Sequence, residues 1–251
     1  MIGDVVGEPG LKALENSLPA LIKEADIDFV IVNGENAADG FGMTAGDYNR
    51  IIAAGADVIT SGNHVWEKRD FWTILENKKN MLRPANYPSG APGSGFTIIQ
   101  KNNINWLVIN LQGRELIGSL DCPFQCIENI LNSQAETNAI ILVDFHAESS
   151  REKESLAYYI DGRISLIAGT HTHIQTADER ILPKGSAYIT DLGMTGVTKS
   201  VIGMDHKICH DRFTKQVQFQ MKTAADEGGE IHGVTAEIDS DSGKAISIKR
   251  I

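Results

Sequence analysis

Cysteine is scarce in this sequence, and the shortage excludes two kinds of protein. The three cysteines, Cys122, Cys126 and Cys209, are an odd number and include no CxxC pair. This usage argues against a secreted disulfide framework and against a thiolate zinc site. We therefore expect a protein of the reducing cytoplasm.

Long apolar runs are absent as well. No stretch approaches the roughly 18 apolar residues that a membrane-spanning helix needs. The N-terminus also lacks a basic region followed by an apolar stretch, the pattern of an export signal. We expect no membrane partner.

Basic residues are outnumbered, which bears on the charge of the ligand. The chain has 23 Lys and Arg against 33 Asp and Glu, a formal net charge of -10, so no stable nucleic-acid partner is expected. An acidic surface repels an anionic substrate at long range. Such a substrate would need a local source of positive charge, which bound metal ions supply.

What remains is an ordinary globular composition. The 251 residues are 42% hydrophobic and 22% charged, which excludes disorder, collagen and coiled coil. No repeat, low-complexity tract or linker divides the chain, and its length is compatible with one core. We expect a single domain over residues 1–251.

Short apolar runs rich in β-branched residues alternate with stretches of helical periodicity. Because parallel strands need crossover connections, this alternation predicts an α/β fold with mixed, largely parallel β-sheets flanked by helices. Turn residues inside two further apolar pairs predict hairpins. The predicted strands are 27–32, 56–60, 140–145, 164–168 and 187–190, the hairpins join 96–100 to 104–109 and 231–239 to 245–249, and the helices are 11–22, 44–54, 67–78, 123–132 and 151–160.

Each predicted strand of the parallel core delivers a metal-binding type of residue at its carboxyl end. In open α/β sheets the carboxyl ends of the strands form the ligand crevice, so these side chains should converge. Only three residues precede Asp4, so the first strand before it is short. We expect this strand to be frayed, or the chain to begin further upstream. The converging set is Asp4, Glu35, Asn36, Asn63, His64, His146, His171 and His173.

Oxygen and imidazole ligands of this kind suit manganese, iron or zinc. Their number favours two ions, with Glu35 as the bridging carboxylate. A pair of divalent ions can activate a water molecule and clamp the oxygens of a phosphoryl group. The sequence therefore predicts two divalent metal ions. The ligand types overlap among the three metals, and we expect iron or manganese ahead of zinc.

Taken singly, the residues have simpler explanations. Asp4 could cap a helix, Glu35 could belong to a polar loop, and His146 could be a buried core histidine. Gly62-Asn63-His64 could be a turn in which glycine and asparagine adopt positive φ. His171 and His173 alternate along what reads as an extended segment, so both should point to one side. Because five strand ends each carry such a residue, chance explains the pattern less well than a shared metal site does.

These blocks also resemble a known family. Gly3-Asp4, Gly62-Asn63-His64, His146 and Gly169-Thr170-His171-Thr172-His173 resemble the ordered motifs of the calcineurin-like metallophosphoesterases. More narrowly, Asn33-Gly34-Glu35-Asn36-Ala37-Ala38, Asp144-Phe145-His146-Ala147-Glu148 and Thr190-Asp191-Leu192-Gly193-Met194-Thr195-Gly196 resemble the YmdB-like bacterial phosphodiesterases. The resemblance covers nearly the whole chain.

The resemblance implies a two-metal phosphodiesterase that acts on cyclic nucleotides of the 2',3'- or 3',5'-cyclic AMP type. Metal-activated hydroxide would attack phosphorus, with His64 as proton donor. Val6, Glu35 and Val65 depart from the wider superfamily, which often has His, Asp and an acidic residue there. In this assignment Asp4, Glu35, Asn36 and His173 hold one ion, and Glu35, Asn63, His146 and His171 hold the other.

Two other functions use the same residues. A phosphomonoesterase or nucleotidase would need the same metals and differ only in the pocket around the leaving group. A non-catalytic, metal-dependent nucleotide sensor would have no need of a proton donor such as His64. In each case the partner is a small phosphate compound, and a homo-oligomer is expected because closed homo-oligomers are common.

Overall fold

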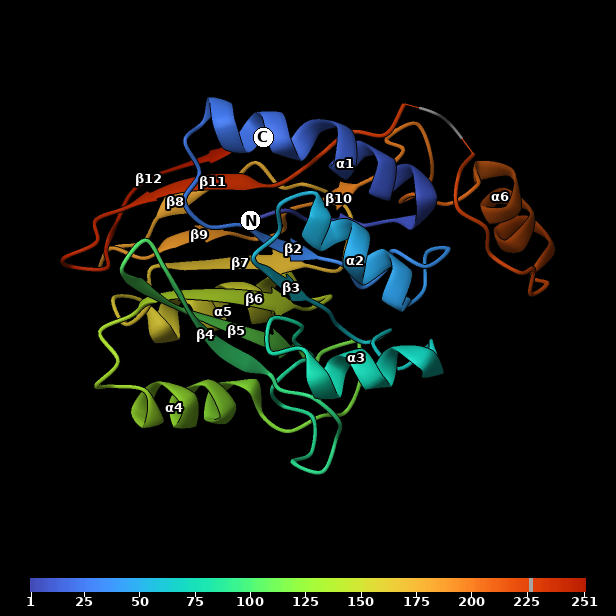
Figure 1. Cartoon of the computed structure of the whole chain (residues 1–251). Coiled ribbons are helices and arrows are strands. Elements are labelled where there is room, and N and C mark those ends of the chain that lie inside the picture. The colour runs from blue at the N-terminus through green and yellow to red at the C-terminus, as the bar shows by residue number, and fades with distance from the viewer. Residues whose placement is uncertain (226–227) are drawn as a thin grey trace.

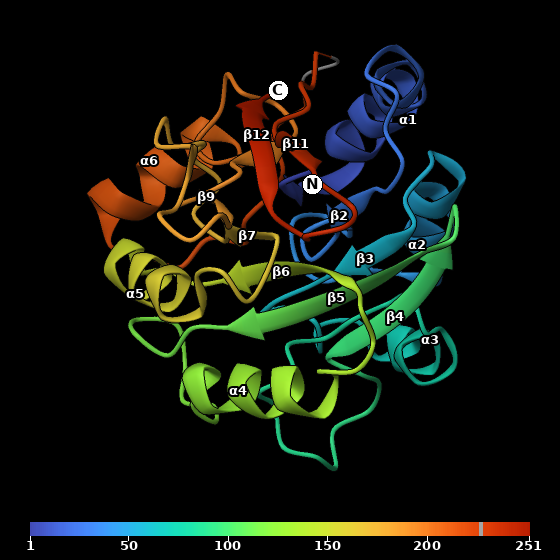
Figure 2. The same ribbon diagram turned by 90° about the vertical axis from the view of Figure 1, so that its left-hand side faces the viewer.

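Two layers of β-strands lie face to face between two layers of helices in the structure, a computed structural model that describes residues 1–225 and 228–251 (Figures 1 and 2). Ile31 and Val58 of one sheet pack against Val108 and Leu142 of the other. This interface is apolar on both sides, as expected for strands buried on both faces. The predicted α/β fold is confirmed.

The larger sheet has six strands in the order β4-β5-β6-β7-β9-β8. Its four central strands are parallel, and the antiparallel strands β4 and β8 form its edges. Gln112, His146 and Thr170 are in register, so the carboxyl ends of β5, β6 and β7 lie side by side at the same end of the sheet. The strands are β4 (Phe96–Lys101), β5 (Ile104–Gln112), β6 (Ile140–His146), β7 (Leu166–Thr170), β8 (Arg180–Ile181) and β9 (Ala187–Ile189).

The second layer of strands consists of three short pairs. β1 (Asp4–Val5) runs parallel to β10 (Met194–Thr195), and β2 (Ile31–Asn33) runs parallel to β3 (Val58–Thr60). The hairpin of β11 (Val234–Ile238) and β12 (Ala245–Arg250) is antiparallel. Single bridges from Ile2 to Val32 and to Gly233 connect the pairs into one layer.

Helices cover the outer faces of the sandwich (Figures 1 and 2). Leu14 and Ile51 are fully buried against β1 and β2, while Ile127 and Leu156 are fully buried against the larger sheet. Burial of these faces accounts for the helical periodicity of the sequence. The helices are α1 (Gly7–Glu24), α2 (Ala45–Ala53), α3 (Trp72–Asn77) after the 3-10 turn η1 (Arg69–Phe71), α4 (Pro123–Ser133), α5 (Ser150–Ile160) and α6 (His206–Lys215).

Most predicted elements are confirmed, with differences at their boundaries. The predicted helix 67–78 divides into η1 and α3, and α1 continues through Pro19. Helix α6 was not predicted: only Cys209 of it is buried, and a helix without an apolar face leaves no periodic signal. Within the described ranges, no helix combines the length and hydropathy needed to cross a bilayer.

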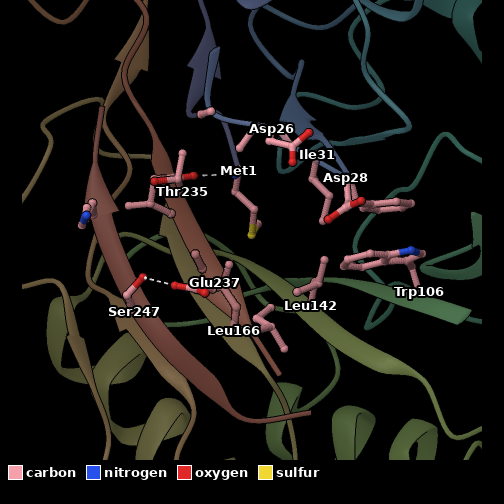
Figure 3. Close-up of a pocket in the computed structure, with 17 residues that line it drawn as sticks. Met1, Asp26, Asp28, Ile31, Trp106, Leu142, Leu166, Thr235, Glu237 and Ser247 are labelled. Atoms are coloured by element: carbon pink, nitrogen blue, oxygen red, sulfur yellow. Dashed lines mark hydrogen bonds between the residues drawn. The ribbon is translucent and has the colours of Figure 1, made fainter. Parts of the chain in front are cut away.

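A cavity of about 600 Å³ lies at the opposite end of the strands from the predicted site (Figure 3). Leu142 and Leu166 contribute from the amino-terminal parts of β6 and β7, with Trp106 from β5. None of the eight predicted site residues is among those that line it. The candidate site must therefore be sought at the carboxyl ends.

Candidate active site

The carboxyl ends of both layers bring most of the predicted ligands together around His146. Its Nε2 atom lies 3.1 Å from Glu35 Oε1, 3.1 Å from Asn63 Oδ1 and 3.0 Å from His171 Nδ1. Three ligand atoms, one each from Glu35, His146 and His171, lie within 4.8 Å of one another. Four segments far apart in the sequence thus meet at one point.

The hydrogen bonds behind His146 determine which of its nitrogens faces the site. Thr170 Oγ1 donates to Asp144 Oδ1 over 2.7 Å, so its oxygen accepts from His146 Nδ1 at 3.0 Å. Asp144 is buried and also accepts from Asn33 Nδ2 at 2.9 Å. With the proton on Nδ1, His146 presents the lone pair of Nε2 to the site.

His171 is oriented in the same sense from the other side. Its Nε2 lies 3.1 Å from Glu148 Oε2, a carboxylate oxygen that favours the tautomer with the proton on Nε2; Nδ1, 3.0 Å from His146 Nε2, is then the nitrogen free to bind a metal. A ring nitrogen from each histidine and the carboxyl group of Glu35 then face one another. A divalent cation bound between them would use each group as a ligand.

Three buried oxygens support the same interpretation. Asp4 Oδ1, Glu35 Oε2 and Asn36 Oδ1 have no hydrogen-bond partner among the described residues. Asn36 Nδ2 donates to the Gly40 carbonyl at 2.9 Å, which fixes the direction of Oδ1. Buried acceptors without donors are costly, and all three belong to the predicted ligand set. The donor set therefore fits divalent metal ions.

Burial also shifts the protonation of these groups. It raises the pKa of Asp4 to about 8 and that of Glu35 to about 7, and it lowers the pKa values of His146 and His171. In both cases loss of solvation disfavours the charged form. A nearby cation would reverse the shift for the carboxyls, because it favours their ionised forms.

His173 and His64 lie beside this cluster and differ in exposure. His173 is 8% exposed, and its Nδ1 donates to the Ile202 carbonyl at 2.9 Å, which leaves Nε2 as an acceptor. The His64 side chain is 26% exposed, with Nδ1 3.3 Å from Glu67 Oε1. Burial dominates the pKa of Glu35, but the charges of His64 and His173 lower it, so both rings are near that carboxyl.

The prediction that His171 and His173 lie on an extended segment is wrong. β7 ends at Thr170, and the two histidines have left-handed φ values of 104° and 65°. Asp4 Oδ2 accepts the His171 amide at 3.1 Å, and Asp191 Oδ2 accepts the Thr172 amide at 3.1 Å. These two carboxylates bend the chain into a turn that the sequence pattern does not reveal.

The explanation offered for Gly62 also changes. Neither Gly62 nor Asn63 has positive φ. A Cβ atom at Gly62 would lie 2.1 Å from Glu35 Oε2 and 2.1 Å from His146 Cδ2. Close approach to the site, and not backbone conformation, requires glycine here.

The residues that hold the ligands in place were not among the predicted site residues. Asn33, Thr60, Asp144 and Thr170 are buried polar residues near the ends of four strands, and Asp144 accepts hydrogen bonds from the other three. Polar residues within otherwise apolar strands were the available signal. Asp4 is the first residue of β1, whereas it was predicted to follow the strand.

Comparison with known proteins gives consistent results over the whole chain. Residues 1–251 match the family described as YmdB-like protein. A relative from Bacillus subtilis (strain 168), named 2',3'-cyclic-nucleotide 2'-phosphodiesterase, is 44% identical over 250 residues, covering 100% of this chain and 94% of the relative.

Two solved structures are also similar. A hypothetical protein from Thermus thermophilus has 37% identity and a TM-score of 0.92, with 100% of this chain and 96% of that chain covered. A protein described as a novel phosphatase, from Mycoplasma pneumoniae, has 33% identity and a TM-score of 0.93, with coverage of 100% and 90%.

Proposed function

Because the chain belongs to the family of YmdB-like proteins, we propose that it is a metal-dependent phosphodiesterase that hydrolyses cyclic nucleotides. The observation that carries the proposal is the convergence of Glu35, His146 and His171, whose ligand atoms lie within 4.8 Å of one another, together with three buried oxygens that have no hydrogen-bond donor among the described residues. Among cyclic nucleotides, 2',3'-cyclic substrates are favoured by the name of the Bacillus subtilis relative.

Two divalent ions bind in this proposal, and each uses ligands from both layers. Bound divalent ions supply a water of lowered pKa and stabilise charge on the phosphoryl oxygens. Manganese or iron is proposed ahead of zinc, and the oxygen and imidazole ligands suit all three metals. Asp4, Glu35, Asn36 and His173 would hold one ion, and Glu35, Asn63, His146 and His171 the other.

His64 is proposed to donate a proton to the leaving oxygen. Its Nδ1 faces Glu67 Oε1 at 3.3 Å, so Nε2 is the nitrogen available to a substrate. The Phe41 ring packs edge-on to His64 with centroids 5.1 Å apart and restricts the rotation of the imidazole. A partly exposed, oriented histidine outside the ligand cluster suits a general acid.

We propose one domain over residues 1–251, a cytoplasmic location, a homo-oligomeric state and no nucleic-acid partner. The formal charge of -10 supports the last point, because an acidic surface disfavours polyanions.

The test is hydrolysis of 2',3'-cyclic AMP by manganese-loaded protein, with metal-stripped protein as the control. We expect turnover only in the loaded form. A second substrate, bis-p-nitrophenyl phosphate, reports diester cleavage without nucleotide recognition. Two bound metals with no turnover of either compound would contradict the proposal and favour the sensor.

A phosphomonoesterase is the second candidate, because the 33% identical solved structure is described as a phosphatase. The ratio of bis-p-nitrophenyl phosphate to p-nitrophenyl phosphate turnover distinguishes the two. A ratio above one supports the diesterase, and a ratio well below one supports the monoesterase.

A further inference from the structure

A buried ion pair lies directly behind the metal-ligand turn and has no part in the proposed mechanism. Lys153 Nζ of α5 is 2.7 Å from Asp191 Oδ2, in the segment after β9, and each side chain is 1% exposed. Removing two charges from water is expensive, so such a pair needs further hydrogen bonds to be tolerated.

Asp191 makes those further bonds to the backbone. Its Oδ2 also accepts from the Thr172 amide at 3.1 Å, and its Oδ1 accepts from the Gly193 amide at 2.8 Å. Thr172 separates His171 from His173, and both histidines are in the left-handed region. Residues without a glycine's freedom stay there only where their surroundings enforce it.

Lys153 reaches the Asp191 carboxylate from α5, and its side chain passes next to β7. The lysine chain passes so close to Gly169 that a Cβ atom there would lie 2.8 Å from Lys153 Cδ. A buried Asp191 without the ammonium would keep an uncompensated charge, and its orientation toward Thr172 would lose a strong charge-assisted bond. The lysine therefore orients the Asp191 carboxylate, and the carboxylate holds the backbone turn at Thr172.

We propose that Lys153 and Asp191 are positioning residues that hold His171 and His173 in the geometry needed to bind metal. The inference rests on the proposed metal site and adds to it the device that orders two of its ligands. Neither residue contacts the ions in this proposal.

The test compares Asp191→Asn with Lys153→Met by calorimetric titration of the metal-free proteins with Mn²⁺. The two substitutions change the charge near the site in opposite directions. If the pair acted only through its charge, Asp191→Asn would weaken Mn²⁺ binding and Lys153→Met would tighten it. If the pair positions the turn, both substitutions weaken Mn²⁺ binding. We expect Kd to rise by about 10- to 100-fold, as for other residues that orient ligands.

Asp57→Asn is a matched control. Asp57 also pairs with a lysine, since Lys101 Nζ lies 2.8 Å from Oδ1, and it also accepts a backbone amide, that of Val30 at 2.8 Å. It precedes β3, at the end away from the site. We expect Asp57→Asn to lower the melting temperature and leave the Kd for Mn²⁺ unchanged.

Unchanged or tighter binding by Lys153→Met would overturn the inference. If Asp191→Asn fails to fold, as judged by circular dichroism of the metal-free protein, Lys153→Met decides the question alone. Failure of the unsubstituted protein to bind Mn²⁺ would instead contradict the proposed function, and the inference with it.

Discussion

His64 and Glu35 are close in space but offer different chemistry, so single substitutions should separate their roles. Glu35 is 1% exposed and contributes to the ligand cluster, whereas the His64 side chain is 26% exposed and lies beside it. We expect His64→Ala to lower kcat by about 10²- to 10⁴-fold, the usual contribution of a general acid, and to keep both metals. Glu35→Ala should lose turnover and metal together.

Metal content after gel filtration, measured by mass spectrometry, checks this prediction alongside kcat. Equal metal loss in the two variants would argue against separate roles. A His64→Ala protein with unchanged kcat would remove His64 from the mechanism.

Gly62 tests how tightly the cluster is packed. In Gly62→Ala the added methyl would meet Glu35 Oε2 and the His146 ring at 2.1 Å, so one ligand must move and Mn²⁺ binding should weaken by about tenfold or more. Gly46→Ala is the control, because its nearest neighbour is Thr44 Oγ1 at 3.5 Å. Equal Kd values for the two alanine variants in a Mn²⁺ titration would show that the site tolerates the methyl group.

At the scale of the element, α2 depends on a cap that can be removed without touching the site. Thr44 Oγ1 accepts the Asp47 amide at 3.2 Å, and Asp47 Oδ2 accepts the Thr44 amide at 2.8 Å. Loss of such a cap costs about 1 kcal/mol. We expect urea unfolding to show this loss for Thr44→Ala and none for Thr73→Ala, an exposed residue within α3; equal stability of the two variants would refute the cap's contribution.

The strands show how much of the fold local sequence patterns predict. Runs such as 140–145 were predicted because an apolar strand is a local signal, and β6 covers this range and ends at His146. The turn after β7 was missed because its bonds come from Asp4 and Asp191. Partners that are 167 and 19 residues away leave no periodicity in the turn itself.

At the scale of the whole molecule, metal and pH should act together on stability. Without metal, burial raises the pKa of Asp4 to about 8 and of Glu35 to about 7, whereas both groups titrate near about 4 when unfolded. Between these values the folded state holds protons that the unfolded state has released. The lowered pKa values of His146 and His171 act in the opposite direction below about pH 6.5, so the free energy of unfolding of the metal-free protein should fall as the pH rises from about 6.5 to about 8.

Mn²⁺ should oppose this trend, since it binds the ionised carboxylates and displaces their protons. We expect the increase in melting temperature on adding Mn²⁺ to be larger at about pH 8 than at about pH 6. Asp4→Asn should reduce the difference between the two pH values. An increase that is independent of pH would mean that these carboxyls are already ionised in the metal-free protein.

The sequence by itself determined the fold class, the family and the chemical types of the ligands. Strand and helix periods are local properties of the chain, and parallel strands necessarily bring their carboxyl ends to one edge. For this reason Glu35, Asn63, His146 and His171 could be grouped without a structure, and the structure places them around one nitrogen atom.

Only the tertiary structure decided how those ligands are held. The proton position on His146 depends on Thr170 and Asp144, the turn at Thr172 depends on Asp191 and Lys153, and each of these contacts joins separate elements. Such contacts follow from the order and register of strands and from helix packing, which no single segment encodes. The residue types were local information, whereas their orientation was set by neighbours distant in the chain.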